Sequence, residues 1–239
     1  MIETLVLASH NRHKVKELAA MLSGRANVRG LLDYDRPPDV EETGATFRAN
    51  AMLKAEAVAA WLVEQHADVE WVLADDSGLC VDVLGGRPGV FSARFSGPAA
   101  TDEENNRKLV HELTALGVER SAAHYECALA LTRTNRGKAA TTMSPGIVLK
   151  AKTPLGGATS RAIDPASGLA VAPTTTLSVV GRCCGWIRTV RRGSGGFGYD
   201  PYFWVDEDTR TFAELTRAAK AARSHRGDAL RQMLAIWPA

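Results

Sequence analysis

The sequence predicts a mixed α/β protein, because strand patterns and helical patterns follow one another along the chain. Residues 3–8 are a short apolar run, and after a polar turn residues 13–22 place apolar side chains at helical spacing. Residues 46–64 repeat the helical pattern before a second apolar run at residues 71–76. Residues 125–131 carry apolar side chains at every second position, which is typical of a half-buried strand. A chain of 239 residues can form one large domain or two intimate lobes.

The polar turn after the first strand carries Ser9, Asn11 and Lys14. Ser9 and Asn11 can cap the following helix, and Lys14 can be a solvated side chain of its first turn. A lysine is locally unfavourable there, because the N-terminus is already the positive end of the helix dipole. A bound anion would reverse that effect, so the turn is either a helix cap or a phosphate site.

The second helix is preceded by Glu41 and Glu42 and carries Lys54. Acidic residues before a helix favour its dipole, and Thr43 or Thr46 can cap its first turn. A lysine beside an apolar helix face usually extends to water. The functional alternative for Lys54 is contact with a phosphate.

The apolar run WVLADD ends in Asp75 and Asp76, which we expect at the carboxyl end of a buried strand. A turn needs only one such residue, and adjacent carboxylates repel each other. One or two carboxylates, completed by phosphates and water, are the usual protein ligands of Mg²⁺. Together with Glu41, Glu42 and two candidate phosphate lysines, the pair favours a Mg²⁺ site, and an acidic turn is the alternative.

Two later segments offer further polar groups. In GSGGFGYDP, Phe197 or Tyr199 could stack on a base and Asp200 could accept hydrogen bonds from its edge, although a tight turn is the alternative. KAARSHRG contributes Lys220, His225 and Arg226, as an ordinary basic helix start or as an anion site. The last helix is expected after SHRG, and a capping box predicts another helix from Thr101.

Composition narrows the function further. The chain has 29 basic and 27 acidic residues, a balance that gives no electrostatic footprint for nucleic acid or an anionic membrane. It lacks an apolar run of about 20 residues and a signal-peptide pattern, so a cytoplasmic protein is expected. Its four cysteines show no metal-ligand spacing. Residues 137–180, with short and broken apolar pieces, are expected to form an extended or ill-ordered insertion.

Five segments in order, SHNRHKVKEL, EETGATFRANAMLKA, LADDSGLCVDVLGGRPGVFSARFSG, GFGYDPYF and SHRGDAL, resemble the Ham1/RdgB family of inosine triphosphate pyrophosphatases. The resemblance covers residues 3–133 and 181–235. It implies an elongated mixed β-sheet with flanking helices, of the Maf/Ham1 type, whose two lobes surround a central cleft. It also implies a single domain over residues 1–239, a homodimer, and Mg²⁺-dependent hydrolysis of ITP, dITP and XTP to the monophosphate and pyrophosphate, which cleanses the nucleotide pool.

The resemblance also assigns roles to residues. Asp76 would be the catalytic base, and the metal ligands would be Glu42 and Asp76, with Asp75 as a further candidate. The substrate would be bound by Ser9, Asn11, Lys14, Lys54, Ser77, Phe197, Gly198, Tyr199, Asp200, Lys220, His225 and Arg226.

Two departures and two rival functions accompany the resemblance. Residues 137–180 replace a short hairpin, and Cys184 stands where an acidic residue is common. A Maf-like pyrophosphatase of modified pyrimidine nucleotides is one rival, against which GFGYDP and SHRG argue. A nucleotide-binding protein that has lost catalysis is the other, and the retained Glu42, Asp76 and Lys14 argue against it.

Overall fold

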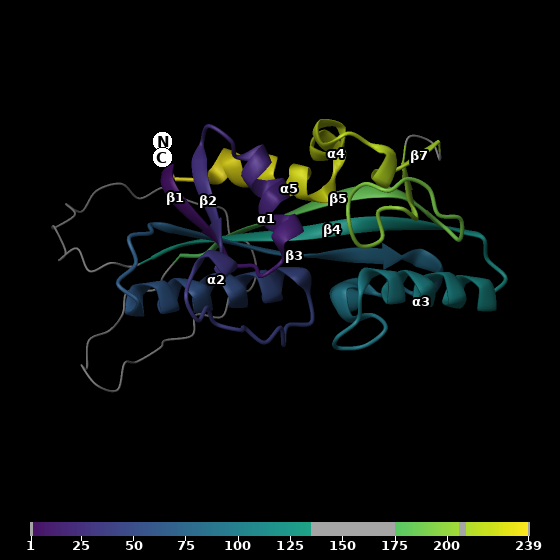
Figure 1. Ribbon diagram of the computed structural model, residues 1–239, viewed down its shortest axis with the longest axis horizontal. Coiled ribbons are helices and arrows are strands. Elements are labelled where there is room, and N and C mark those ends of the chain that lie inside the picture. Colours follow the sequence, from purple (N-terminus) through teal and green to yellow (C-terminus); the bar gives the residue numbers. More distant parts are fainter. Residues whose placement is uncertain (1, 135–174, 206–208, 239) are drawn as a thin grey trace, which may run out of the picture.

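The computed structural model describes residues 2–134, 175–205 and 209–238 (Figure 1). These residues form one seven-stranded sheet in the order β2-β1-β3-β4-β5-β6-β7. The strand bounds are β1 Ile2–Leu7, β2 Ala26–Gly30, β3 Trp71–Val81, β4 Arg120–Arg133, β5 Leu177–Arg188, β6 Phe203–Val205 and β7 Arg210–Thr211. Strand β1 is parallel to β2 and β3, and the remaining pairs are antiparallel. The predicted mixed α/β class is confirmed.

Three long strands give the molecule its elongated form (Figure 1). They contain 11 residues in β3, 14 in β4 and 12 in β5, and β4 pairs with both neighbours along most of its length. The elongated sheet is therefore as expected. The division into two lobes around a central cleft stays a prediction.

The helices cover both faces of this sheet. Their bounds are α1 Arg12–Met21, α2 Phe47–Glu64, α3 Asp102–Ala115, α4 Arg217–Arg223 and α5 His225–Ile236. Helix α2 lies on one side of the long strands, and α1, α4 and α5 lie on the other (Figure 1). The buried side chains of α2 pack with Val72 and Ala74, whereas those of α1 and α5 pack with Leu73 and Leu129. No helix within the described ranges is long and apolar enough to cross a membrane.

The predicted end of the strand at the acidic pair is wrong. Strand β3 continues to Val81, so Asp75 and Asp76 lie in its middle, opposite Leu129 and Ala128 of β4. The backbone there is buried and needs hydrogen-bond partners, and the neighbouring strand supplies them more completely than a turn could. The strand that does end beside the pair is β1, whose last residue, Leu7, is opposite Leu73.

The end of β1 explains how both carboxylates can reach one region. Beyond Leu73, no strand among the described residues pairs with the edge of β3 that faces β1. Successive strand side chains point to opposite faces, so Asp75 lies on the α1 and α5 side and Asp76 on the α2 side. In α/β proteins, ligands bind at the carboxyl ends of parallel strands. Here the parallel strand that ends beside the acidic pair is β1, not β3.

Two other boundaries differ from the prediction. Residues Leu177 to Val180, which we expected within the insertion, begin β5 and pair with β4. The rest of that expected insertion, up to residue 174, lies outside the described residues. The last helix begins at His225, inside SHRG, because the Ser224 hydroxyl accepts a hydrogen bond from the Gly227 amide and caps it. Strand β2 and helix α4 were not predicted.

Candidate active site

Segments that are distant in sequence surround a cavity of about 740 Å³ at the carboxyl end of β1. Every predicted site residue except Asp75 lines it: Ser9, Asn11, Lys14, Glu42, Lys54, Asp76, Ser77, Phe197, Gly198, Tyr199, Asp200, Lys220, His225 and Arg226. The Asp75 side chain is 0% exposed and lies against residues that line the cavity. The structure thus brings together groups that the sequence separates by more than two hundred positions.

The turn before α1 is a helix cap, as one reading of the sequence predicted. The Asn11 side-chain oxygen, Oδ1, accepts hydrogen bonds from the backbone amides of His13 and Lys14, at 2.9 and 3.2 Å, and the Ser9 hydroxyl accepts one from the backbone amide of Asn11. The Lys14 side chain is not solvated, because its ammonium lies 2.6 Å from Asp75 and its side chain is only 15% exposed. The cap and the buried lysine therefore coexist at the rim of the cavity.

Asp75 is surrounded by hydrogen-bond donors. Its Oδ1 is 2.6 Å from Lys14 Nζ and 2.9 Å from the Ser77 hydroxyl, which donates to it. Its Oδ2 accepts from Arg226 Nε at 2.7 Å and from the Cys127 thiol at 3.2 Å. Burial raises the pKa of Asp75, but Arg226 and Lys14 outweigh burial and hold that pKa well below its usual range. Asp75 therefore stays ionised and fixes two cations in place.

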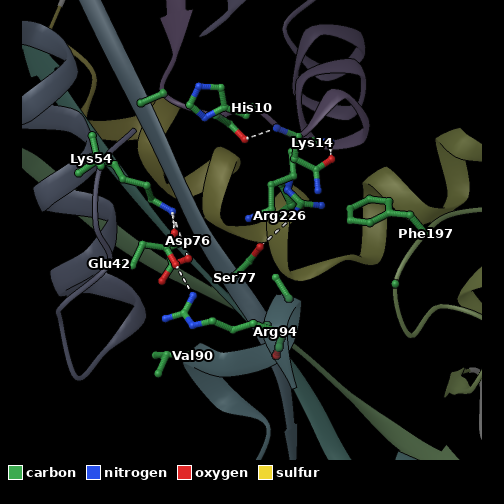
Figure 2. Close-up of a pocket in the computed structure, with 18 of the residues that line it drawn as sticks. His10, Lys14, Glu42, Lys54, Asp76, Ser77, Val90, Arg94, Phe197 and Arg226 are labelled. Atoms are coloured by element: carbon green, nitrogen blue, oxygen red, sulfur yellow. Dashed lines mark hydrogen bonds and ion pairs between the residues drawn. The ribbon is translucent and has the colours of Figure 1, made fainter. Parts of the chain in front are cut away.

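On the other face of β3, Lys54 joins two carboxylates. Its ammonium lies 2.6 Å from Glu42 and 3.2 Å from Asp76, and Arg94 is 3.0 Å from the second Glu42 oxygen (Figure 2). Burial lowers the pKa of Lys54, but Asp76 and Glu42 outweigh it and raise that pKa overall. Thr46, not Glu42, caps α2, because its hydroxyl accepts a hydrogen bond from the Ala49 amide.

Asp76 has one oxygen without a partner. Its Oδ2 is buried and has no hydrogen-bond partner among the described residues. Burial raises the pKa of Asp76, and Lys54 and Lys14 offset this only in part. A carboxylate with a raised pKa and a free oxygen can accept a proton or bind a metal ion.

Phe197, Tyr199 and Asp200 form a tight turn, as one reading of GSGGFGYDP predicted. Asp200 accepts hydrogen bonds from the Phe197 amide at 2.9 Å and from Lys220 Nζ at 2.6 Å. The Tyr199 hydroxyl donates to the Ser92 carbonyl, and its ring is buried, so Tyr199 packs the wall of the cavity. The half-buried Phe197 ring stacks on His13 and is the ring more available to a base.

Arg226 and Lys220 share a carboxylate that the sequence reading missed. Glu17 lies 2.7 Å from Lys220 Nζ and also pairs with the Arg226 guanidinium. Burial raises the pKa of Glu17, but the two cations outweigh it and lower that pKa. Its position one helical turn after Lys14 was the available signal. Arg94 was also missed, although it lies within a segment that carries the family resemblance.

His225 is held as a neutral imidazole. Its ring stacks on Tyr125 with centroids 4.6 Å apart, and its Nδ1 is buried without a hydrogen-bond partner among the described residues. Burial and the neighbouring Arg226 place the pKa of His225 well below its usual value. A buried nitrogen without a partner is available to a polar ligand.

Fold and site together define a mixed α/β protein whose cavity is lined by lysines and arginines that pair with carboxylates. The chain belongs to the Ham1 family, whose sequence model matches residues 5–165 and 158–236.

The chain is similar to several pyrophosphatase relatives and to solved structures. It is 38% identical over 237 residues to a dITP/XTP pyrophosphatase of Geobacillus kaustophilus, covering 99% of this chain and 95% of the relative. It is also 38% identical to a dITP/XTP pyrophosphatase of Streptococcus agalactiae, but it spans only 60% of that protein's length. A HAM1 protein from Coxiella burnetii superposes with a TM-score of 0.70 at 33% identity, covering 99% of this chain and 98% of that one. The Staphylococcus aureus Ham1 protein gives 0.67 at 31% identity, covering 97% and 96%.

Proposed function

We propose that the protein hydrolyses non-canonical purine nucleoside triphosphates, namely ITP, dITP and XTP, to the monophosphate and pyrophosphate. The observation that carries the proposal is the Asp76 oxygen that has no partner among the described residues, beside Lys54 and Glu42 and in the same cavity as Lys14 and Phe197. The names of the relatives in Geobacillus and Streptococcus support this class of substrate.

Glu42 and Asp76 fit a Mg²⁺ ion. The partnerless Oδ2 of Asp76 is a hard oxygen ligand, and the Glu42 carboxylate faces the same ammonium group. Among the described residues, no group of three histidine, cysteine, aspartate or glutamate side chains forms a complete metal site. Phosphate oxygens and water would therefore complete the coordination. When bound, the ion would supply charge neutralisation at the phosphate under attack.

The side chains of this chain would do the remaining chemistry. Lys14, Lys54 and Arg94 would compensate the charge that shifts to the pyrophosphate leaving group. Asp76 would orient the attacking water and accept its proton, a role that suits its raised pKa. Asp75, whose side chain is 0% exposed and does not line the cavity, would position Lys14 and Arg226 rather than bind the metal.

His225 would contribute to the choice of base. A protonated ring nitrogen of His225 can donate a hydrogen bond to a 6-oxo group, which adenine lacks, and an unmatched donor in a buried site is costly. The ring of Phe197 would stack on the base, and the loop around Asp200 would exclude the 2-amino group of guanine. The His225→Ala variant tests the role of His225 in recognising the 6-oxo group. Unchanged selectivity for ITP over ATP in this variant would contradict that role.

One assay distinguishes the proposal from its rivals. The protein is incubated with ITP, dITP, XTP, ATP, GTP or modified pyrimidine nucleotides, with Mg²⁺ or with EDTA, and pyrophosphate and orthophosphate are measured separately. We expect Mg²⁺-dependent pyrophosphate release from ITP, dITP and XTP. Preference for modified pyrimidines would indicate a Maf-like enzyme, and binding without turnover a sensor. Orthophosphate as the first product would refute cleavage between the α- and β-phosphates.

We also propose that the protein is a cytoplasmic homodimer. The family resemblance supports the dimer, and light scattering would then give about twice the chain mass of 25.6 kDa. A monomer mass at micromolar concentration would contradict it.

A further inference from the structure

One buried polar side chain has no role in the chemistry described above. Asn50 lies in the first turn of α2 and is 0% exposed, with Phe47 and Ala51 as buried neighbours on the same helix. Burying a primary amide costs free energy unless its groups form hydrogen bonds. An apolar residue would pack there without that cost, so the amide requires an explanation.

The oxygen of Asn50 holds the loop that carries Glu42. The Gly44 amide donates a hydrogen bond to Asn50 Oδ1 at 2.7 Å. A Cβ on residue 44 would lie 2.6 Å from that oxygen and 2.7 Å from the Ala49 Cβ, so only glycine permits this approach. Glu42 stands two residues before Gly44, and the contact therefore fixes its backbone against α2.

The side-chain nitrogen of Asn50, Nδ2, takes no part in the hydrogen bond with Gly44. Because the Gly44 amide can only donate, Oδ1 must be its partner, and the orientation of the side-chain amide is fixed. Its Nδ2 is buried and has no hydrogen-bond partner among the described residues, which is also true of Asp76 Oδ2. The Asn50 amide is a neighbour of the Asp76 carboxyl, and it offsets only part of the rise in the pKa of Asp76 that burial causes. One side chain thus contacts the Glu42 loop and adjoins Asp76.

We propose that Asn50 is a positioning residue, which holds the Glu42 loop against α2 through Gly44 and thereby sets the spacing of Glu42 and Asp76. The purpose of that spacing, metal binding, rests on the proposed function. The contact between Asn50 and Gly44 does not depend on it. Groups that orient metal ligands from outside the coordination sphere typically change metal affinity about 10- to 100-fold when they are removed.

Hydrogen exchange tests the contact without nucleotide or metal. In Asn50→Ala, we expect the Gly44 amide to exchange about tenfold faster or more, while core amides of β4 keep their rates. Asn50→Asp keeps the acceptor oxygen and should retain Gly44 protection within about threefold. Gly44→Ala should loosen residues 41–46, and the double variant should be no worse than the more affected single variant. Arg48→Ala, an exposed change in the same helical turn, is the control and should change nothing.

Metal binding tests the consequence. Mn²⁺ alone is titrated into each protein, and the free ion is measured by electron paramagnetic resonance. We expect affinity to fall about tenfold or more in Asn50→Ala and Gly44→Ala but not in Arg48→Ala. Unchanged Gly44 exchange in Asn50→Ala, equal loss of protection in Asn50→Asp, or unchanged Mn²⁺ affinity despite a loosened loop would each overturn the proposal. If the parent protein instead fails to release pyrophosphate from ITP, the proposed function fails and the exchange result still stands.

Discussion

At the scale of single residues, the adjacent aspartates have opposite surroundings. Asp75 has four donors around its two oxygens and a pKa held well below the usual range. Asp76 has one partnerless oxygen and a raised pKa. The difference follows from strand geometry, because consecutive side chains face opposite sides of the sheet. One carboxylate is therefore fully paired, and the other keeps an oxygen without a partner among the described residues.

Replacing Asp76 by asparagine should abolish turnover and leave the fold intact. The substitution keeps the shape of the side chain but removes the base and a metal-binding oxygen, so we expect kcat for ITP to fall by at least about 10³-fold, within the range of general-base and metal-ligand losses. Pyrophosphate release measures the effect, and circular dichroism checks the fold. Hydrolysis of ITP at the parent rate would refute the assignment of Asp76.

Glu17→Gln should destabilise the protein and weaken substrate binding. The change leaves Lys220 and Arg226 with less compensating charge, and removing one partner of a buried ion pair costs about 3–5 kcal/mol. We expect the lower part of that range, because the Glu17 side chain is 18% exposed. Urea unfolding measures the loss. The exposed ion pair of Arg36 and Asp35 supplies the control, since Asp35→Asn should leave the urea midpoint unchanged.

At the scale of elements, the unbroken strand β3 is what places the site. It pairs with β4 from Trp71 to Val81 and pairs with β1 only as far as Leu73. Its middle is packed so closely that Gly78 has no room for a side chain: a Cβ there would lie 2.3 Å from the Ser92 hydroxyl and 2.6 Å from the Gly89 carbonyl oxygen. The strand and the segment Gly89–Arg94, which carries Arg94, are thereby held together.

Gly78→Ala should push the segment Gly89–Arg94 away from β3 and destabilise the protein. Overpacking of a close contact costs about 1–3 kcal/mol, which corresponds to a fall in Tm of roughly 2–4 °C for each kcal/mol in a protein of this size. Calorimetry measures the shift. Thr114→Ser, an exposed and conservative change on α3, is the matched control. An unchanged Tm in Gly78→Ala would show that the segment Gly89–Arg94 can move without loss of stability.

At the scale of the whole molecule, burial of charge couples stability to pH. Cations and carboxylates from α1, α2, β3 and α5 compensate one another inside the cavity, so most of them stay ionised. His225 is the exception, because it is buried as a neutral ring with its pKa far below the usual value. The unfolded chain protonates this histidine near its ordinary pKa of about 6.5, whereas the folded chain does not.

Stability should therefore fall as the pH is lowered below about 6.5. There the unfolded state binds a proton that the folded state excludes, which costs up to about 1.4 kcal/mol for each pH unit. Urea unfolding at pH 7.5, 6.5 and 5.5 measures the slope. His225→Gln removes the titrating group and should flatten the slope between pH 6.5 and 5.5. An equal slope in the variant would show that other groups cause the dependence.

Local sequence by itself determined the helices other than α4 and the set of chemical groups. The helix predicted at residues 46–64 is α2 at Phe47–Glu64, and the capping box from Thr101 begins α3, because capping and spacing act within one or two turns. Order and spacing of motifs also identified the family and, with it, residues that line one cavity.

Only the tertiary structure decided what surrounds each group. The course of β3 through the acidic pair, the sharing of Glu17 by two cations and the contact of Asn50 with Gly44 depend on segments far apart in the chain or on loop geometry. Desolvation and charge compensation arise from packing between such segments, and they hold the pKa of Asp75 well below the usual range while the pKa of Asp76 is raised.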